Sequence, residues 1–217
     1  MPAESVENRS VRRLRRGVFF CFEGIDGAGK TTQALALQNK IRDWGAEAVY
    51  VKEPTNGVWG QKIRQIALHG REGVTPEEEL DYFIRDREED VRDNIAPVLA
   101  RQGVVIADRY FYSTIAYQSV LGLKEDDIRR LNQDFPVPDV VFILEISTDL
   151  SQNRITQSRG ETANLGYEQA RFLADVKRVF DAMPDPNIVR IDGDRSIDAV
   201  ASDIWNRAET LLTELCD

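Results

Sequence analysis

Side chains that commonly serve as acid–base groups or metal ligands are scarce in this sequence of 217 residues, which has one histidine, two cysteines and two methionines. Cys21 and Cys216 lack metal-ligand spacing and cannot form a disulfide framework of the secreted kind. We interpret both as reduced thiols, which predicts a cytoplasmic protein. His69 lies in an ordinary position between a helix and a loop, so we expect a structural role for it.

Long apolar runs and an excess of basic residues are also missing. No run approaches the roughly 20 apolar residues needed to span a bilayer. The formal net charge is -9, whereas a nucleic-acid polymer normally requires a basic face. We therefore expect neither a membrane nor a nucleic-acid polymer among the partners. A small anionic ligand is still compatible with this charge, because a local cluster of amide N–H groups is positive.

The first 16 residues differ in composition from the rest of the chain. They contain five arginines and few apolar residues, without the apolar segment of a secretory signal. We expect a flexible basic arm over residues 1–16, with an organellar address as the alternative. Residues 17–217 are long enough to bury one good core, so we predict a single domain there.

A glycine-rich turn from Gly24 to Thr31 matches the pattern G-x-x-x-x-G-K-S/T at every fixed position. Glycines allow positive φ angles and a close approach of the backbone to a ligand, so successive amides can bind phosphate at a helix N-terminus. We expect Lys30 to reach the β- and γ-phosphates of a nucleotide and the Thr31 hydroxyl to ligate Mg²⁺. The predicted ATP-binding residues are Gly24, Asp26, Gly27, Ala28, Gly29, Lys30, Thr31 and Thr32.

Short apolar runs alternate with helical patterns along the chain. The runs do not alternate with polar residues, which predicts strands buried on both faces. They cover residues 18–22, 48–51, 104–107, 140–144 and 188–191. Helices are predicted after the glycine-rich turn and over 61–68, 76 onward with a kink at Pro97, 113–120, 125–132, 149–159, 168–183 and 197–212. The chain therefore predicts an α/β, three-layer P-loop NTPase fold with a five-stranded parallel sheet, and ligands at the carboxyl ends of its strands.

Two further positions carry charge where a ligand is expected. Asp108 ends the strand at 104–107, as a carboxylate behind a bound magnesium ion does in P-loop proteins, although a helix-capping role is the alternative. Arg109 next to it would face the same crevice and hold a second phosphate. On the helix that starts at Thr75-Pro76-Glu77-Glu78, Phe83 and Arg87 share a face. Phe83 is either a core residue or a stacking platform, and a buried Arg87 needs acceptors, which a stacked base would supply.

Taken together, these motifs resemble the thymidylate kinase family from about residue 17 to the C-terminus. The glycine-rich turn is extended by Phe22-Glu23 before it and Thr32-Gln33 after it. The other matching residues are Glu53-Pro54, Gly60-x-Lys62-Ile63-Arg64, Phe83-x-x-Asp86-Arg87, Asp108-Arg109-Tyr110-x-x-Ser113-x-x-Ala116-Tyr117-Gln118, Pro138-Asp139, Arg154 and Arg159-Gly160. The resemblance implies phosphorylation of dTMP to dTDP by ATP and Mg²⁺ in dTTP biosynthesis. It also implies a homodimer packed through helices, for which the apolar stripe from Leu80 to Ile95 could serve.

The resemblance also assigns residues to the acceptor nucleotide. Asp26 would accept a hydrogen bond from the deoxyribose 3′-hydroxyl, and Tyr117 would fill the space of a ribose 2′-hydroxyl. Arg64 and Arg109 would bind the dTMP phosphate, with Glu23 near the metal and that phosphate. At the base, Phe83 would stack on thymine, Arg87 would donate to O4, which selects against cytosine, and Gln118 would touch the base edge. The remaining substrate-binding positions are Glu53, Pro54 and Ser113.

The chain departs from the family pattern in the lid, which we expect over about 159–167. One arrangement in the family places a catalytic arginine inside the glycine-rich turn, but this chain has Gly27 there. The other places it in the lid, which points to Arg159 and Arg154, although Leu165-Gly166-Tyr167-Glu168 lacks one usual arginine. With Lys30, Arg109 and Glu23, these two arginines complete the predicted catalytic set. Lys52 also replaces the arginine that usually precedes Glu53-Pro54, which keeps the charge but loses the bidentate fork.

Two other functions compete with this interpretation. A kinase for another deoxynucleotide or a deoxynucleoside is the first, with Glu23 as a possible base for a hydroxyl acceptor. A phosphate acceptor needs no base, because its second pKa near 6 leaves it largely dianionic at pH 7. A GTPase switch is the second, but the chain lacks the Asn-Lys-x-Asp guanine signature and has no D-x-x-G sequence after Asp108.

Overall fold

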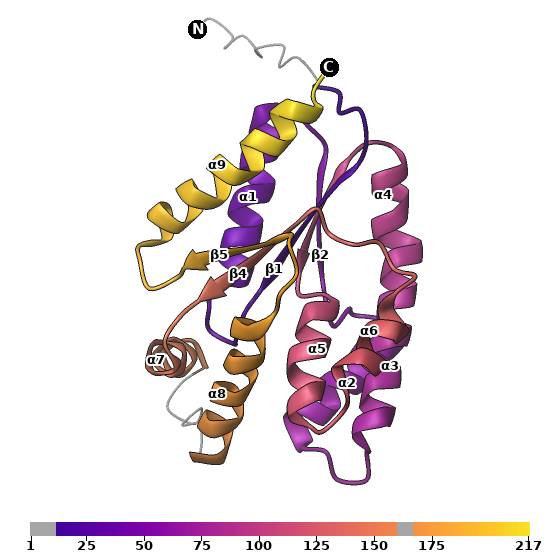
Figure 1. Ribbon diagram of the computed structural model, residues 1–217, viewed down its shortest axis with the longest axis vertical. Helices are drawn as coiled ribbons and strands as arrows, with labels where there is room; N and C mark the ends of the chain where they lie inside the picture. Colours follow the sequence, from indigo (N-terminus) through magenta and orange to yellow (C-terminus); the bar gives the residue numbers. More distant parts are fainter. Residues whose placement is uncertain (1–11, 160–166) are drawn as a thin grey trace, which may run out of the picture.

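A five-stranded parallel sheet forms the centre of the computed structural model, which describes residues 12–159 and 167–217 (Figure 1). The strands lie in the order β2-β3-β1-β4-β5. They span Val18–Glu23 (β1), Ala48–Lys52 (β2), Val104–Asp108 (β3), Val140–Glu145 (β4) and Ile188–Asp192 (β5). All five predicted strands are confirmed, as is the predicted α/β fold. Every residue of β1 and β3 is buried, as expected for central parallel strands covered on both faces.

Helices cover both faces of this sheet. They span Lys30–Trp44 (α1), Val58–His69 (α2), Pro76–Asp90 (α3), Ala96–Ala100 (α4), Phe111–Val120 (α5), Glu125–Asn132 (α6), Thr148–Arg159 (α7), Tyr167–Ala182 (α8) and Ile197–Leu215 (α9). Figure 1 shows α1 and α9 packed together on one side and α4 on the opposite side, while α5 contacts both α6 and α8. Within the described ranges, no helix has the length and apolar character needed to cross a membrane.

Helix α3 begins at a capping box and is followed by a π-helical turn. The Thr75 hydroxyl accepts from the Glu78 amide at 3.2 Å, and the Glu78 carboxylate accepts from the Thr75 amide at 2.9 Å, so a capping box forms at the predicted start of this helix. The predicted kink takes the form of a π-helical turn over Val91–Ile95, just before Pro97. A proline has no N–H to donate within the helix, and an inserted wide turn is one way to accommodate it.

Residues 12–16 belong to the folded domain, which differs from the predicted flexible arm. Leu14 is 2% exposed and forms an antiparallel bridge with Cys216. The Arg12 amide donates to the Gly45 carbonyl oxygen at 2.9 Å, and its guanidinium lies 4.2 Å from the Trp44 ring centre. Burial of Leu14 explains why these residues are ordered despite their arginines. Residues 1–11 of the predicted arm lie outside the described residues.

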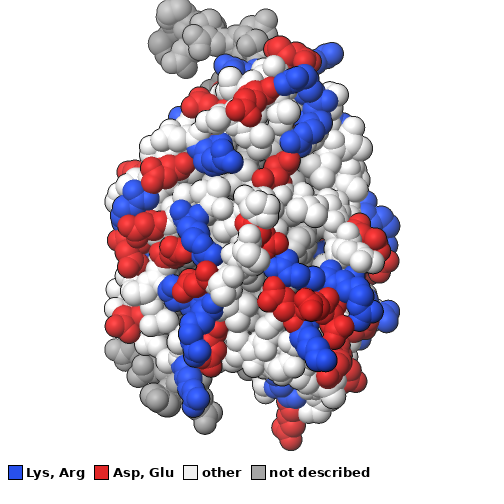
Figure 2. Space-filling model, in the orientation of Figure 1, with Lys and Arg blue, Asp and Glu red and all other residues white. Residues whose placement is uncertain are grey.

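Acidic and basic side chains are interspersed on the molecular face seen in Figure 2, with no broad basic area there. The apolar stripe on α3 is used inside the monomer. Leu80 and Ile95 are buried, and Ile84 and Val91 pack on the core. Part of the stripe is therefore used inside the monomer, and its role in a subunit contact stays a prediction. Exposed apolar side chains also occur on α2, where Val58 is 65% and Leu68 73% exposed.

Candidate active site at the ends of β1, β2 and β3

The glycine-rich turn connects β1 to α1 in the predicted manner. Gly24, Gly27 and Gly29 have φ angles of 129°, 76° and 94°, in the region that other residues rarely adopt. A Cβ atom on Gly27 would lie 2.8 Å from the Ser151 carbonyl oxygen. The backbone of α7 therefore leaves no room at position 27 for an arginine.

Lys30 points back into this turn. Its ammonium donates to the carbonyl oxygens of Gly24 at 3.0 Å and Ile25 at 2.8 Å, and the residue is 7% exposed. Burial, with repulsion from Arg109, lowers the pKa of Lys30 to about 8. The Lys30 ammonium thus binds two backbone carbonyl oxygens, whereas the sequence predicts that it binds phosphate oxygens of a nucleotide.

Asp108 gathers three donors at one carboxylate oxygen. The Thr31 hydroxyl donates to Asp108 Oδ2, as does the Tyr50 hydroxyl at 3.0 Å. The Lys52 ammonium lies 3.2 Å from the same atom and 3.1 Å from Thr31 Oγ1. The structure therefore brings together the two predicted magnesium-binding residues. It adds Tyr50 and Lys52, which the sequence did not assign to the metal site because their proximity depends on the pairing of β2 with β3.

Glu23 organises the turn that follows β3. It is fully buried and accepts from the amides of Tyr110 at 2.8 Å and Ser113 at 3.1 Å, and from the Ser113 hydroxyl at 2.5 Å. Burial raises the pKa of Glu23, and the Ser113 hydrogen bond opposes that shift. Arg109 lies in this turn with a φ of 76°, unusual for a residue with a side chain. Glu23 is thus placed to hold Arg109 in its conformation.

The Arg109 guanidinium joins several predicted acceptor residues. It donates to the Asp26 carboxylate at 2.5 Å and to the Ser113 hydroxyl at 2.8 Å. It also lies 5.3 Å from the centre of the Tyr117 ring. The glycine-rich turn and α5 therefore both contribute side chains around Arg109, which itself follows β3.

Arg87 has protein acceptors around it in this structure. Its guanidinium donates to Glu53 through Nε, at 3.1 Å, and through Nη2, and also to Asn132 Oδ1 at 2.6 Å and Thr114 Oγ1 at 3.1 Å. The side chain is 0% exposed. The acceptors that a buried guanidinium requires thus come from three separate segments of the chain, whereas the sequence suggested a stacked base. The predicted contact with thymine O4 stays a prediction.

Three more of the residues predicted to bind the acceptor nucleotide are Arg64, Phe83 and Gln118. Arg64 donates to the carbonyl oxygens of Pro54, at 2.6 Å, and Thr55, so it holds the loop after β2. Phe83 is only partly buried, and the core of the described residues does not include it, which favours a platform over a core role. Gln118 is 0% exposed, yet among the described residues its amide oxygen and nitrogen have no hydrogen-bond partner. A buried amide without protein partners is satisfied by water or by another bound group.

Arg154 lies beside the part of the glycine-rich turn that the sequence assigns to ATP. Its guanidinium donates to the Gly27 carbonyl oxygen at 3.4 Å and to the Gly193 carbonyl oxygen at 3.2 Å. With Gly29 and Thr32 it lines a cavity of about 190 Å³, which Arg195 also borders. The Arg159 side chain and the predicted lid residues 160–166 lie outside the described parts of the structure.

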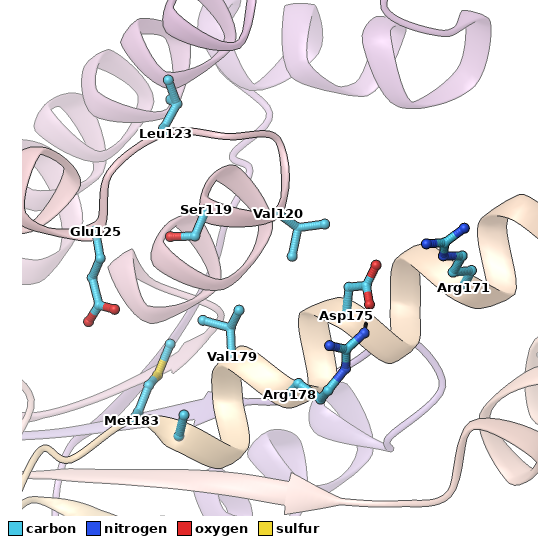
Figure 3. A pocket seen from close by; sticks show the side chains of 10 residues that line it. Ser119, Val120, Leu123, Glu125, Arg171, Asp175, Arg178, Val179 and Met183 are labelled. Atoms are coloured by element: carbon cyan, nitrogen blue, oxygen red, sulfur yellow. Dashed lines mark hydrogen bonds and ion pairs between the residues drawn. The ribbon is translucent and has the colours of Figure 1, made fainter.

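A larger cavity of about 660 Å³ lies between α8 and the segment joining α5 to α6 (Figure 3). Val120, Val179 and Met183 contribute apolar surface, and Asp175 pairs with Arg178 at its edge. None of its lining residues belongs to the predicted phosphate, metal or nucleoside sites. The chemical groups described above are therefore concentrated at the strand ends, away from this cavity.

Comparison with known proteins gives a consistent result. A profile described as "Thymidylate kinase" matches residues 22–204. A thymidylate kinase of Desulfotalea psychrophila is 41% identical over 196 residues, covering 90% of this chain and 96% of the relative. One of Xylella fastidiosa (strain M23) is 42% identical over 186 residues, covering 86% and 84%. One of Xanthomonas oryzae pv. oryzae is 41% identical over 184 residues, covering 85% and 79%.

Proposed function

The chain belongs to the thymidylate kinase family, and we propose that it transfers the γ-phosphoryl group of ATP to dTMP in the crevice at the carboxyl ends of β1, β2 and β3. ATP-dependent phosphorylation of dTMP is the activity that the names of its relatives support. The observation that carries the proposed location is the convergence of Lys30, Thr31, Asp108 and Arg109 on one side of the glycine-rich turn.

The transfer needs charge neutralisation more than proton removal. An oxygen of the dTMP phosphate forms a bond to the γ-phosphorus while the bond to the β–γ bridging oxygen breaks, which yields dTDP and ADP. The attacking phosphate is largely dianionic at pH 7, so no base is required. Two anions must approach each other, and Lys30 and Arg109 are placed to offset their repulsion.

The donor side would be held by the glycine-rich turn. Gly24 to Thr32 would offer amide donors, and Lys30 would exchange its two carbonyl partners for phosphate oxygens. Thr31 and Asp108 fit a magnesium ion, because Mg²⁺ prefers oxygen ligands and because the Lys52 ammonium already shows that these oxygens accept a cation. Bound Mg²⁺ would supply positive charge at the β- and γ-phosphates.

The acceptor side would be built around Arg109. In our proposal Arg109 and Arg64 bind the dTMP phosphate, and Asp26 turns from Arg109 to the 3′-hydroxyl of the sugar. Phe83 stacks on thymine, and Gln118 supplies the buried amide that lacks a protein partner. The ion pair of Glu53 and Arg87 would form the wall behind the base. Arg87 would donate to O4 once one of its N–H groups turns away from its protein acceptor. The proposed acceptor site also includes Pro54, Ser113 and Tyr117.

Arg154 and Arg159 are the proposed cations for the transferring group. Arg154 already contacts the Gly27 carbonyl and is within the donor region. Arg159, at the end of α7, would add charge from the lid. The absence of space for a side chain at Gly27 supports an arrangement in which this charge comes from α7 and the lid.

Substrate choice is tested with a panel of acceptors. Release of ADP is measured with dTMP, dUMP, dCMP, dGMP and thymidine at equal concentrations. We expect dTMP to be preferred, because in our proposal Gln118 and Phe83 bind the base and Arg109 binds its phosphate. Preference for thymidine would contradict a phosphate acceptor, and preference for dCMP or dGMP would contradict the proposed base site.

We also propose a cytoplasmic homodimer. Val58 and Leu68 on α2 are exposed, and Trp59 on the same helix stacks with Tyr82 of α3 at 5.7 Å between ring centres. These apolar groups on α2 and α3 support a subunit contact in this part of the molecule. Light scattering during gel filtration would give the mass, and Leu68→Lys should shift a dimer toward the monomer.

A further inference from the structure

Lys52 is the last residue of β2 and lies directly opposite Asp108 in the parallel pairing of β2 with β3. This register brings the start of its side chain to the edge of the sheet where the glycine-rich turn also lies. The side chain is 49% exposed, whereas that of Asp108 is 1% exposed. The ammonium of Lys52 therefore lies between a buried carboxylate and solvent.

The ammonium contacts the same two oxygens that we assign to Mg²⁺. Its Nζ atom is 3.1 Å from Thr31 Oγ1 and 3.2 Å from Asp108 Oδ2. The other cations of this region have different partners: Lys30 donates to two carbonyl oxygens and Arg109 donates to Asp26. In the described part of the chain, Lys52 is thus the cation that bridges Thr31 and Asp108.

A lysine suits position 52 better than the arginine that usually precedes Glu53-Pro54 in the family. An ammonium is a compact point charge with three donors, so it can bind two oxygens from different segments much as a metal ion does. Mg²⁺ binds oxygen at about 2.0–2.1 Å. A dication bound by the same two oxygens would share them with the ammonium, and like charges held by the same oxygens repel each other.

We propose that Lys52 is a counter-ion within the proposed magnesium site and that it competes with the metal for Thr31 and Asp108. Lys52 holds the two oxygens together before Mg²⁺ binds, and binding of the metal displaces its ammonium toward solvent and the crevice. The flexible four-carbon stem allows this movement without a change in β2. The inference rests on the magnesium site in the proposed function.

Competition predicts that removal of the ammonium strengthens metal binding. Mn²⁺ serves as the probe, and its free concentration is followed by electron paramagnetic resonance in solutions of the nucleotide-free protein. Lys52→Met should bind Mn²⁺ about two- to fivefold more tightly than the unsubstituted protein, the range expected when a half-exposed ion pair is lost. Lys62→Met on α2 is the matched control and should leave the affinity unchanged. Asp108→Asn should weaken binding whether or not Lys52 is present.

The reciprocal measurement follows the lysine itself. Mass spectrometry after brief amine acetylation should show that Mg²⁺ increases labelling of Lys52 in the unsubstituted protein, with Lys62 unaffected, because coupling between two ligands acts in both directions. Equal or weaker Mn²⁺ binding by Lys52→Met would overturn the competition but leave the metal site intact. Absence of any Mn²⁺ binding that depends on Asp108 would overturn the metal site and the inference with it.

Discussion

Glu53 and Arg87 form an ion pair from which solvent is almost excluded, with side chains 4% and 0% exposed. Glu53 follows β2, and Arg87 lies on α3, so the pair connects two segments that are 34 positions apart. Thr114 on α5 and Asn132 on α6 accept from the same guanidinium. Burial raises the pKa of Glu53, and Arg87 opposes that shift by favouring the charged carboxylate. The pair thus fixes the relative positions of elements that we expect to surround the base.

Removal of one partner should be costly because the other charge stays buried. We expect Glu53→Ala to lower the free energy of unfolding by about 3–5 kcal/mol, measured by urea denaturation. Asp81→Ala, which breaks an exposed pair with Arg85 on the same helix, should cost less than about 1 kcal/mol. A similar small cost for both variants would show that the buried pair has no special role in stability.

Phe83 should contribute to dTMP binding more than to folding. A base–aromatic stack is worth about 1–3 kcal/mol, so Phe83→Ala should raise KM for dTMP by roughly tenfold or more. KM for ATP and the thermal midpoint should change little, because the ring is only partly buried. An unchanged KM for dTMP would assign Phe83 to packing.

The two arginines of α7 should act on the rate of transfer. Arg159→Ala should lower kcat far more than the affinity for dTMP, since an arginine at a transferring phosphoryl group is worth about 10³–10⁵ in rate. Arg154→Ala provides the comparison, because its side chain already contacts the glycine-rich turn. Full activity of Arg159→Ala together with a large loss in Arg154→Ala would move the role to Arg154.

Nucleotide affinity should depend on pH through Lys30. Its pKa is lowered to about 8 by burial, so the free protein loses the lysine charge as pH rises above this value. Protonated Lys30 is the form that binds phosphate, and the affinity for ATP with Mg²⁺ should therefore fall between pH 7.5 and 9.5 in calorimetric titrations. Lys30→Arg should bind more weakly but show a flatter profile, because arginine stays charged throughout. An equally steep profile in that variant would assign the titration to another group.

Much of this arrangement follows from local sequence. The turn from Gly24 to Thr31 has a conformation that its glycines permit, and the apolar runs form the strands they predict. The capping box at Thr75 needs only four neighbouring residues. In each case the interaction that determines the structure lies within a few positions along the chain.

Other features depend on contacts between distant segments and leave no local pattern. Arg87 meets Glu53, Thr114 and Asn132 only after β2, α3, α5 and α6 have packed, so its acceptors could not be assigned in advance. The approach of Tyr50 and Lys52 to Asp108 depends on strand order and register. Leu14 gave no signal among the surrounding arginines, because its bridge to Cys216 joins opposite ends of the chain.

The π-helical turn at Val91–Ile95 has a consequence for how the chain tolerates length changes. Such a turn contains one residue more than an α-helical turn, and each residue of an α-helix advances by about 100° around the axis. Deletion of one residue from this turn would restore regular winding but rotate α3 relative to α4 by about a quarter turn. Phe83 and Arg87 would then face away from their present neighbours. The extra residue therefore sets the rotation between α3 and α4, so that α4 packs against β3 while Phe83 and Arg87 keep the orientation we propose for binding the base.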